Sequence, residues 1–176
     1  MARLVVVRHA KSDYPWGVTD HDRPLNERGR RDAPALGAWL DEHLTWDGPP
    51  PLVVVSTARR AQLTWRLARS AMSARWDAAD VRDEPRIYEA SVPTIVSVLV
   101  EAASAPEAAE TVIVVGHNPG LAGLVHSCGR PSALRDEATV KFPTSAVAVL
   151  VNDDRLIDGL KGAGGFDVQE FAVPRG

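Results

Sequence analysis

The clearest pattern in the chain is a set of three short apolar runs rich in β-branched residues. They are Leu4–Val7, Leu52–Val55 and Val112–Val115. Continuous runs of this kind are typical of strands that are buried on both faces of a parallel sheet. Each run is followed by a polar or small residue and then by a segment with helical periodicity. This alternation predicts an α/β fold with a mainly parallel central sheet.

Apolar positions at helical spacing predict four helices. Their ranges are 26–44, 58–73, 92–103 and 121–128. Asn26 is suited to cap the first helix. Pro34 lies inside the same pattern, so that helix either kinks there or begins after Asn26.

Two further strands are predicted near the end of the chain, at 146–151 and 167–173, with a glycine-rich loop between them. Since no helix-length connection is expected in that loop, we expect these strands to be antiparallel at an edge of the sheet. Together the elements predict a three-layer α/β/α sandwich. We expect residues 1–176 to form a single domain.

Composition narrows the class of protein. The chain has 176 residues, of which 45% are hydrophobic and 24% charged, and this balance argues against disorder. A net charge of −3 argues against a general nucleic-acid binder. The single cysteine, Cys128, cannot form an internal disulfide and favours a reducing compartment. No apolar run is long enough for a signal peptide or a membrane helix, so we expect a cytoplasmic protein with no membrane partner.

Charged side chains follow the apolar runs at the end of a parallel sheet where ligands bind. Arg8 and His9 follow the first run, Arg59 and Arg60 follow the second, and His117 follows the third. Arginine presents a planar donor fork that fits phosphate or carboxylate oxygens. The same cations would repel a metal ion. The convergence predicts a phosphoryl-binding site with no metal and no cofactor.

Two features add to this prediction. The helices expected after Ser56 and after Pro119 would direct backbone N–H donors toward an anion. A neutral imidazole at the centre of such a site can attack phosphorus, carry the phosphoryl group transiently and lose it to water.

These residues stand within five sequence blocks that resemble the histidine phosphatase superfamily, which includes the cofactor-dependent phosphoglycerate mutases. In detail the blocks resemble its SixA-type phosphohistidine phosphatase branch. They occur in the order found in the family and span most of the chain to about Val151. The blocks are Arg8–Ser12, Asp22–Gly29, Ser56–Thr64, Ile87–Ala90 and Val115–Gly120.

The resemblance implies a role for each matching residue. His9 would be the nucleophile that forms a phosphohistidine intermediate. Arg8 and Arg60 would bind the phosphoryl oxygens, because the family register from Ser56 falls on Arg60. His117 would donate to the phosphoryl group and stabilise the transition state.

Other residues have less defined roles. Glu89 falls where many members of the family place the acid that protonates the leaving group, and Asp20 and Asp22 are alternative acids. Arg59 is expected to be solvated.

Some histidines and the cysteine have ordinary structural explanations. The run Asp20–Asp22 resembles a metal-binding pattern, but no further ligand is fixed by spacing, so we expect a solvated loop. We expect His43 at a helix C-terminus, His126 in packing or at the surface, and Cys128 in the core.

The chain departs from the mutase members of the family in two ways. They have glycine where this chain has Ala10, and they carry a lid for which the segment between Arg60 and Glu89 is too short. A mutase must retain its intermediate, which requires enclosure. We therefore expect a phosphatase without a lid domain.

The substrate is left open between two partners. The first is phosphohistidine of a protein, and the alternative is a small phosphorylated metabolite such as a sugar or nucleotide phosphate. A phospho-protein-binding module without turnover is a third reading, which the intact set of site residues disfavours. Specificity would lie in loop 13–24 and in the segment after Asn152. The sequence leaves the oligomeric state open, and an open domain of this size can be a monomer.

Overall fold

The computed structural model describes residues 1–104 and 109–176. Within them the strands form one sheet in the order β3-β2-β4-β1-β5-β6. Strands β1 to β4 are parallel to one another, whereas β5 is antiparallel to β1 and β6 is antiparallel to β5. The predicted mainly parallel sheet with an antiparallel edge is therefore confirmed. The strands are β1 (Ala2–Arg8), β2 (Leu52–Ser56), β3 (Asp80–Glu84), β4 (Thr111–Gly116), β5 (Val147–Asn152) and β6 (Asp167–Ala172).

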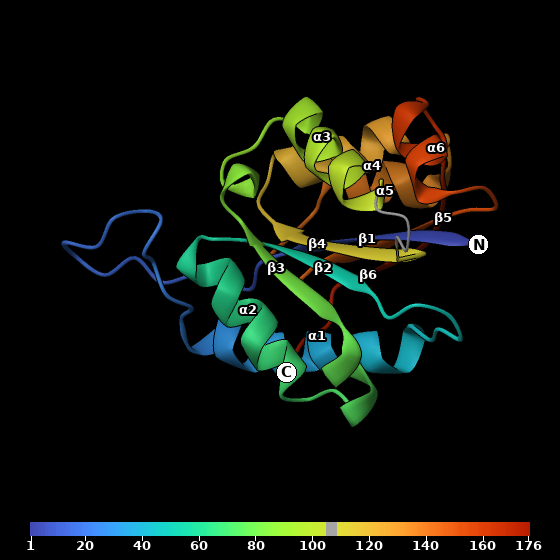
Figure 1. Ribbon diagram of the computed structural model, residues 1–176. Helices are drawn as coiled ribbons and strands as arrows, with labels where there is room; N and C mark the ends of the chain where they lie inside the picture. The colour runs from blue at the N-terminus through green and yellow to red at the C-terminus, as the bar shows by residue number, and fades with distance from the viewer. Residues whose placement is uncertain (105–108) are drawn as a thin grey trace.

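Helices cover both faces of this sheet, as Figure 1 shows. Helices α1 and α2 lie on one face and α3 to α6 on the other, which confirms the three-layer α/β/α architecture. The α-helices are α1 (Glu27–His43), α2 (Arg59–Arg69), α3 (Val92–Ala103), α4 (Gly120–Cys128), α5 (Ala133–Val140) and α6 (Leu156–Lys161). Two 3₁₀ helices, η1 (Ala74–Ala78) and η2 (Pro85–Ile87), flank β3.

The central strands are apolar throughout because both of their faces are buried. In β1, Val5 and Val7 pack with the side chains of α1 and α2. Leu4 and Val6 pack on the opposite face, with α3, α4 and α6. This two-sided burial removes the polar alternation that a half-exposed strand would show.

The first predicted helix forms without a break. The side chain of Asn26 caps α1 by accepting a hydrogen bond of 2.9 Å from the backbone N–H of Gly29. Pro34 lies within the helix. None of the helices among the described residues is both long and apolar enough to cross a membrane.

The prediction of an uninterrupted loop between the last two strands is wrong, because α6 forms there. Leu156 and Leu160, one helical turn apart, are buried and anchor it. Gly159 lies within α6, and a methyl group at its Cα would come within 2.6 Å of the Phe166 ring. This glycine permits close packing and does not mark a loop. Helix α5 was also not predicted.

Candidate active site

Two neighbouring parallel strands bring two histidines to the same edge of the sheet. Strands β1 and β4 pair through Arg8 and Gly116, so the residues that follow, His9 and His117, lie side by side. Their ring centroids are 5.0 Å apart, and each residue is only 7% exposed. The backbone N–H of His9 donates to the carbonyl of Gly116 over 3.1 Å. The register of the sheet therefore sets the separation of the two imidazoles.

The surroundings of His9 fix its protonation. Its Nδ1 lies 2.7 Å from the carbonyl oxygen of Ala10, which can only accept a hydrogen bond. Its Nε2 accepts a hydrogen bond of 3.3 Å from Nε of Arg60. Burial lowers the pKa of His9 to about 3, so the ring is neutral near pH 7. The hydrogen therefore lies on Nδ1 and the lone pair on Nε2, which is the form that can attack phosphorus.

The surroundings of His117 allow its hydrogen to lie on Nδ1, the nitrogen that does not contact Ser56. Its Nε2 lies 2.8 Å from Oγ of Ser56. That hydroxyl also accepts from the backbone N–H of Ala58 over 3.3 Å, and its own hydrogen can be donated to Nε2 of His117. Nδ1 of His117 is buried and has no hydrogen-bond partner among the described residues. Burial, with Arg60 nearby, lowers the pKa of His117 to about 4. With its hydrogen on Nδ1, the ring would offer a donor to a ligand oxygen.

Helix α2 places Arg60 against His9. Arg60 is buried, whereas the preceding residue, Arg59, is exposed, because adjacent helical positions point about 100° apart. The Arg60 guanidinium also donates from Nη2 to a carboxylate oxygen of Asp20 over 3.0 Å. The structure thus brings Arg60, and not Arg59, to the paired histidines.

Arg8 reaches the same site from the end of β1. Its Nη1 donates to the carbonyl of Phe142 over 2.8 Å. Its Nε is buried without a hydrogen-bond partner among the described residues. This buried donor can be satisfied by an oxyanion in the site.

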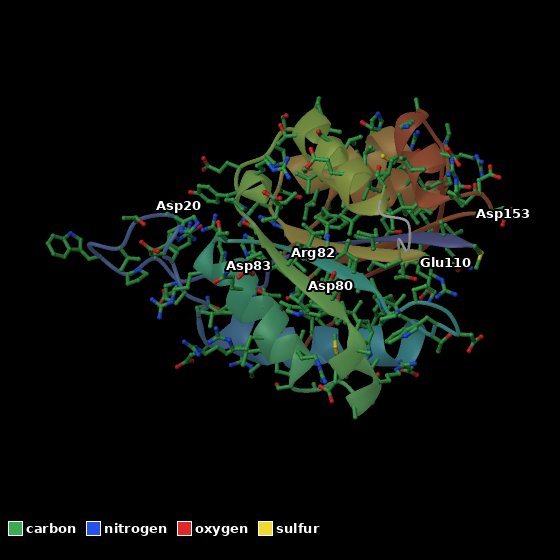
Figure 2. All side chains as sticks on the ribbon, in the orientation of Figure 1. Asp20, Asp80, Arg82, Asp83, Glu110 and Asp153 are labelled. Atoms are coloured by element: carbon green, nitrogen blue, oxygen red, sulfur yellow. The ribbon has the colours of Figure 1, made fainter. Side chains whose placement is uncertain are left out.

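These side chains surround a cavity of about 220 Å³ at the carboxyl ends of the parallel strands. Its lining combines four cations with two carboxylates and the two histidines. The cations are Arg8, Lys11, Arg23 and Arg60, and the carboxylates are Asp20 and Glu89. A larger hollow of about 800 Å³ borders Glu110 and Asp153 and has no histidine in its lining. Figure 2 shows Asp20 at one end of the molecule and these two residues at the other.

Asp20 is held by three donors. Its carboxylate accepts from the hydroxyl of Tyr88 (2.7 Å), from Nη1 of Arg23 (2.7 Å) and from Arg60 (3.0 Å). These contacts, with the hydrogen bond from Tyr88 the largest, hold the pKa of Asp20 well below its usual range. The group is therefore ionised and occupied, which argues against Asp20 as the acid.

The other two acid candidates differ in position. Glu89 is exposed and lines the cavity, and its φ of 50° lies in the left-handed region, which is uncommon for glutamate. Asp22 accepts from the Thr19 hydroxyl over 2.8 Å and is not part of the cavity lining. Of the candidates, Glu89 is thus the carboxyl group that lies at the site without being tied to Arg60.

The free N–H donors predicted at the start of α2 are largely in use. The N–H of Ala58 donates to Ser56, and that of Arg59 donates to the carbonyl of His21 over 2.9 Å. The loop that contains His21 folds back over the helix start. This segment therefore contributes to the site mainly through the Arg60 side chain.

The remaining histidines and the cysteine have structural positions. Nε2 of His21 lies 3.0 Å from Oγ1 of Thr57. His43 lies in the last turn of α1 and His126 is exposed on α4, both as predicted. Cys128 is buried, and burial raises the pKa of its thiol to about 11. In the part of the chain that the structure describes, no group of three or more His, Cys, Asp or Glu side chains could hold a metal.

The sequence pattern predicted no role for several residues of the site, three of which contact its polar groups. Ser56 contacts His117, and the Tyr88 hydroxyl contacts Asp20. The side chain of Asn118 donates to the carbonyl of Phe142 over 2.9 Å and lines the cavity. All three lie within the sequence blocks described above. Asn118 follows His117, Tyr88 precedes Glu89, and Ser56 begins the block that contains Arg60. These neighbours were the available signal in the sequence.

Comparisons with known proteins find a matching family and similar sequences. The family model of the histidine phosphatase superfamily (branch 1) matches residues 4–95. An uncharacterised protein of Mycobacterium tuberculosis is 37% identical over 148 residues, which cover 82% of this chain and 85% of the relative.

Solved structures share the fold. A protein from Nakamurella multipartitia assigned as the phosphohistidine phosphatase SixA is 32% identical, with a TM-score of 0.80 over 98% of this chain and 96% of that one. A mycobacterial glucosyl-3-phosphoglycerate phosphatase is 16% identical, with a TM-score of 0.61 over 95% of this chain and 97% of that one. At that identity the second likeness concerns the fold alone.

Proposed function

The chain belongs to the histidine phosphatase superfamily, and on this premise we propose that it hydrolyses a phosphoryl group through a phosphohistidine intermediate on His9. One observation carries the proposal. Nδ1 of His9 lies against the carbonyl of Ala10 while Nε2 accepts from Arg60. The lone pair of a neutral imidazole therefore lies on the nitrogen beside a phosphoryl-binding guanidinium.

In the first step, Nε2 of His9 attacks phosphorus. A bond forms between Nε2 and phosphorus, and the bond from phosphorus to the leaving group breaks with its electron pair moving to the leaving atom. The leaving atom takes a proton from Glu89. Arg8, Arg60 and Nδ1–H of His117 stabilise the charge on the three phosphoryl oxygens.

In the second step, water attacks the phosphorus of phosphohistidine. The phosphorus–Nε2 bond breaks and its electron pair returns to the imidazole. Glu89, now a carboxylate, accepts the proton that water loses. The products are inorganic phosphate and His9 in its starting form, so no cofactor enters the cycle.

We propose phosphohistidine of a protein as the substrate. The likeness to the protein from Nakamurella multipartitia assigned as SixA supports this choice. Figure 1 shows loop 13–24 extending away from the sheet, and its residues Tyr14, Asp20 and Arg23 form one wall of the cavity. A site walled by a loop, without an inserted lid domain among the described residues, admits a side chain carried on a protein surface. The phosphorus–nitrogen bond of this substrate also needs less help from an acid than an alkyl ester does.

The enzymatic proposal is tested by replacing the nucleophile. We expect the wild-type protein to release phosphate from a generic phosphomonoester and to form an acid-labile phosphoenzyme. His9→Ala should lose turnover by roughly 10³-fold or more and form no phosphoenzyme, whereas the control His126→Asn, at an exposed residue, should retain both. A wild-type protein with neither property would contradict catalysis and favour the binding module.

The substrate proposal is tested by comparing rates side by side. A protein phosphorylated on histidine with phosphoramidate should give a higher kcat/KM than any member of a panel of sugar and nucleotide phosphates. A metabolite that is hydrolysed about tenfold faster than this protein would favour the alternative, a small-molecule phosphatase.

A further inference from the structure

A second hollow adjoins the catalytic cavity. It has a volume of about 420 Å³, and we call it the anion groove. Arg8, Lys11, Asn118 and Thr144 line both hollows, whereas Lys141 lines only the groove. Because four residues are common to the two hollows, one ligand can occupy both.

The groove differs from the catalytic cavity in charge balance. On the side of loop 13–24, the carboxylate of Asp20 pairs with Arg60 and Arg23 at 3.0 and 2.7 Å. On the side of the groove, Arg8, Lys11 and Lys141 form no ion pair with any described residue, and no Asp or Glu lines the groove. The positive charge beside His9 is therefore uncompensated in one direction only.

The wall of the groove is fixed relative to the nucleophile. The carbonyl of Phe142 accepts hydrogen bonds from Nη1 of Arg8 (2.8 Å) and from Nδ2 of Asn118 (2.9 Å). These two residues adjoin His9 and His117 in the chain. The backbone N–H of Ser145 donates to the carbonyl of His9 over 3.2 Å. The segment that contains Lys141 is thus held at a set position beside the reacting centre.

We propose that the anion groove binds a second anionic group, a carboxylate or a phosphate, of the substrate whose phosphoryl group reacts at His9. The inference rests on the proposed function and narrows its substrate class to phosphorylated compounds with two anionic groups. Arg8 faces both hollows, so it contributes to each. Lys11 and Lys141 supply point charges to the second anion.

The chemistry fits two sources. A phosphorylated metabolite can carry a carboxylate or second phosphate, and a phosphorylated protein can carry an acidic side chain beside its phosphohistidine. Both present the same group to Lys141, so the experiments below first test the shared chemistry and then separate the sources.

The first experiment measures binding without turnover. Alkylphosphonates of two to six carbons are compared with phosphonates of the same length that end in a carboxylate, because their carbon–phosphorus bond is not hydrolysed. Titration calorimetry at low salt should show at least one length for which the carboxylate tightens binding roughly tenfold. Absence of a preference at every length would overturn the proposal.

Matched variants locate the preference. Lys141→Gln and Lys11→Gln should each reduce the tenfold preference for the two-anion ligand to about threefold or less. Lys161→Gln, an exposed lysine at the end of α6 that lines neither hollow, should leave the preference in place. If Lys161→Gln reduces the preference for the two-anion ligand as much as the other variants do, or if Lys141→Gln does not reduce it, the second anion does not bind in the groove.

The second experiment separates the two sources. The kcat/KM of phosphohistidine peptides with a flanking Glu is compared with that of peptides with Gln, and phosphorylated metabolites with a carboxylate are compared with their uncharged amides. A Lys141-dependent preference in one pair identifies the source, and no preference in either pair overturns the proposal. If phosphonates bind with the expected preference while no substrate is hydrolysed, the proposed function fails and the groove does not. If a substrate is hydrolysed without any preference for a second anionic group, the proposed function stands and the proposal for the groove fails.

Discussion

At the scale of single residues, two carboxyl groups at the site have opposite surroundings. Asp20 accepts hydrogen bonds from Tyr88, Arg23 and Arg60, which keep its pKa low. Glu89 lines the same cavity but is exposed. A general acid must hold a proton that it can release in the transition state. This contrast supports the proposed acid role of Glu89 and indicates that Asp20 positions Arg60.

Glu89→Gln should therefore act according to the leaving group. For an alkyl phosphate, whose alkoxide is a poor leaving group, kcat/KM should fall about 10²-fold. For p-nitrophenyl phosphate, whose leaving group needs no proton, the fall should be threefold or less on the same principle. Steady-state rates on both esters make the comparison, with Glu137→Gln at an exposed position of α5 as the control. Equal losses on both esters would contradict the acid role.

The two buried imidazoles also make stability depend on pH. Burial lowers the pKa of His9 to about 3 and of His117 to about 4, against about 6.5 in an unfolded chain. Between these values the unfolded state binds more protons. The contribution of these two groups to the free energy of unfolding is therefore fully present above about pH 6.5 and is lost as pH falls toward about 4 for His117 and about 3 for His9. At pH 5 the loss is on the order of 2 kcal/mol for each residue.

Urea unfolding at pH 7.5 and pH 5.0, in buffer without phosphate, measures this effect. His9→Asn and His117→Asn should each lose about 2 kcal/mol less than the wild-type protein between the two pH values. His126→Asn, at an exposed residue, should lose as much as the wild type. If both site variants lose as much free energy of unfolding between the two pH values as the wild-type protein does, buried neutral imidazoles do not explain the pH dependence.

At the scale of elements, the sequence was most informative for the strands whose two faces are both buried. The three apolar runs became β1, β2 and β4 because each packs against helices on two sides. Strand β3 shows no such pattern, since it lies at the edge of the sheet and its residues Asp80–Asp83 are exposed. Helix α5 buries only Ala138, so its periodicity is equally weak. Contacts made across the fold, and not local pattern, define these two elements.

The packing of α1 on α2 depends on a glycine. A methyl group at Gly37 would lie 2.0 Å from the carbonyl oxygen of Ala68. Since Gly37 and Ala68 both lie within helices and the carbonyl belongs to the backbone, the helices would have to move apart. We expect Gly37→Ala to cost roughly 1–3 kcal/mol of stability and to lower Tm by several degrees. Because α2 carries Arg60, kcat/KM should also fall.

Thermal unfolding checks this expectation, with Gly48→Ala as the matched control. Nothing lies within 4 Å of a methyl group at Gly48, so the same change in composition has no packing consequence there. A Gly37→Ala protein as stable as the control would show that the two helices can separate without cost.

At the scale of the whole molecule, the site depends on segments that are far apart in the sequence. The ends of β1 and β4 could be placed together from the sequence, because parallel strands share one ligand-binding edge. The contacts of Asp20 with Tyr88 and Arg60 could not, because the fold-back of loop 13–24 follows no periodic pattern. The net charge of −3 likewise gave no sign that Arg8, Lys11 and Lys141 meet beside one cavity.

This concentration of cations in an acidic chain should make an oxyanion stabilise the folded state. Tungstate is a tetrahedral oxyanion like phosphate, and at about 100 times its Kd it should add about 2.7 kcal/mol to the free energy of unfolding. For a chain of this length that corresponds to a rise in Tm of about 5–10 °C. Sulfate-free thermal scans of each variant with and without tungstate measure the shift.

Two adjacent arginines make the test specific. Arg59→Ala should keep the tungstate-dependent rise in Tm, because Arg59 is exposed, whereas Arg60→Ala should lose most of it, because Arg60 is buried beside His9. Arg60→Lys should recover only part of the tungstate-dependent rise in Tm, since an ammonium keeps the charge but lacks the planar donor fork. Scans without ligand give each variant its own baseline and so separate lost binding from lost stability. A full tungstate shift in Arg60→Ala would mean that the anion binds elsewhere, and the proposed phosphoryl site would be wrong.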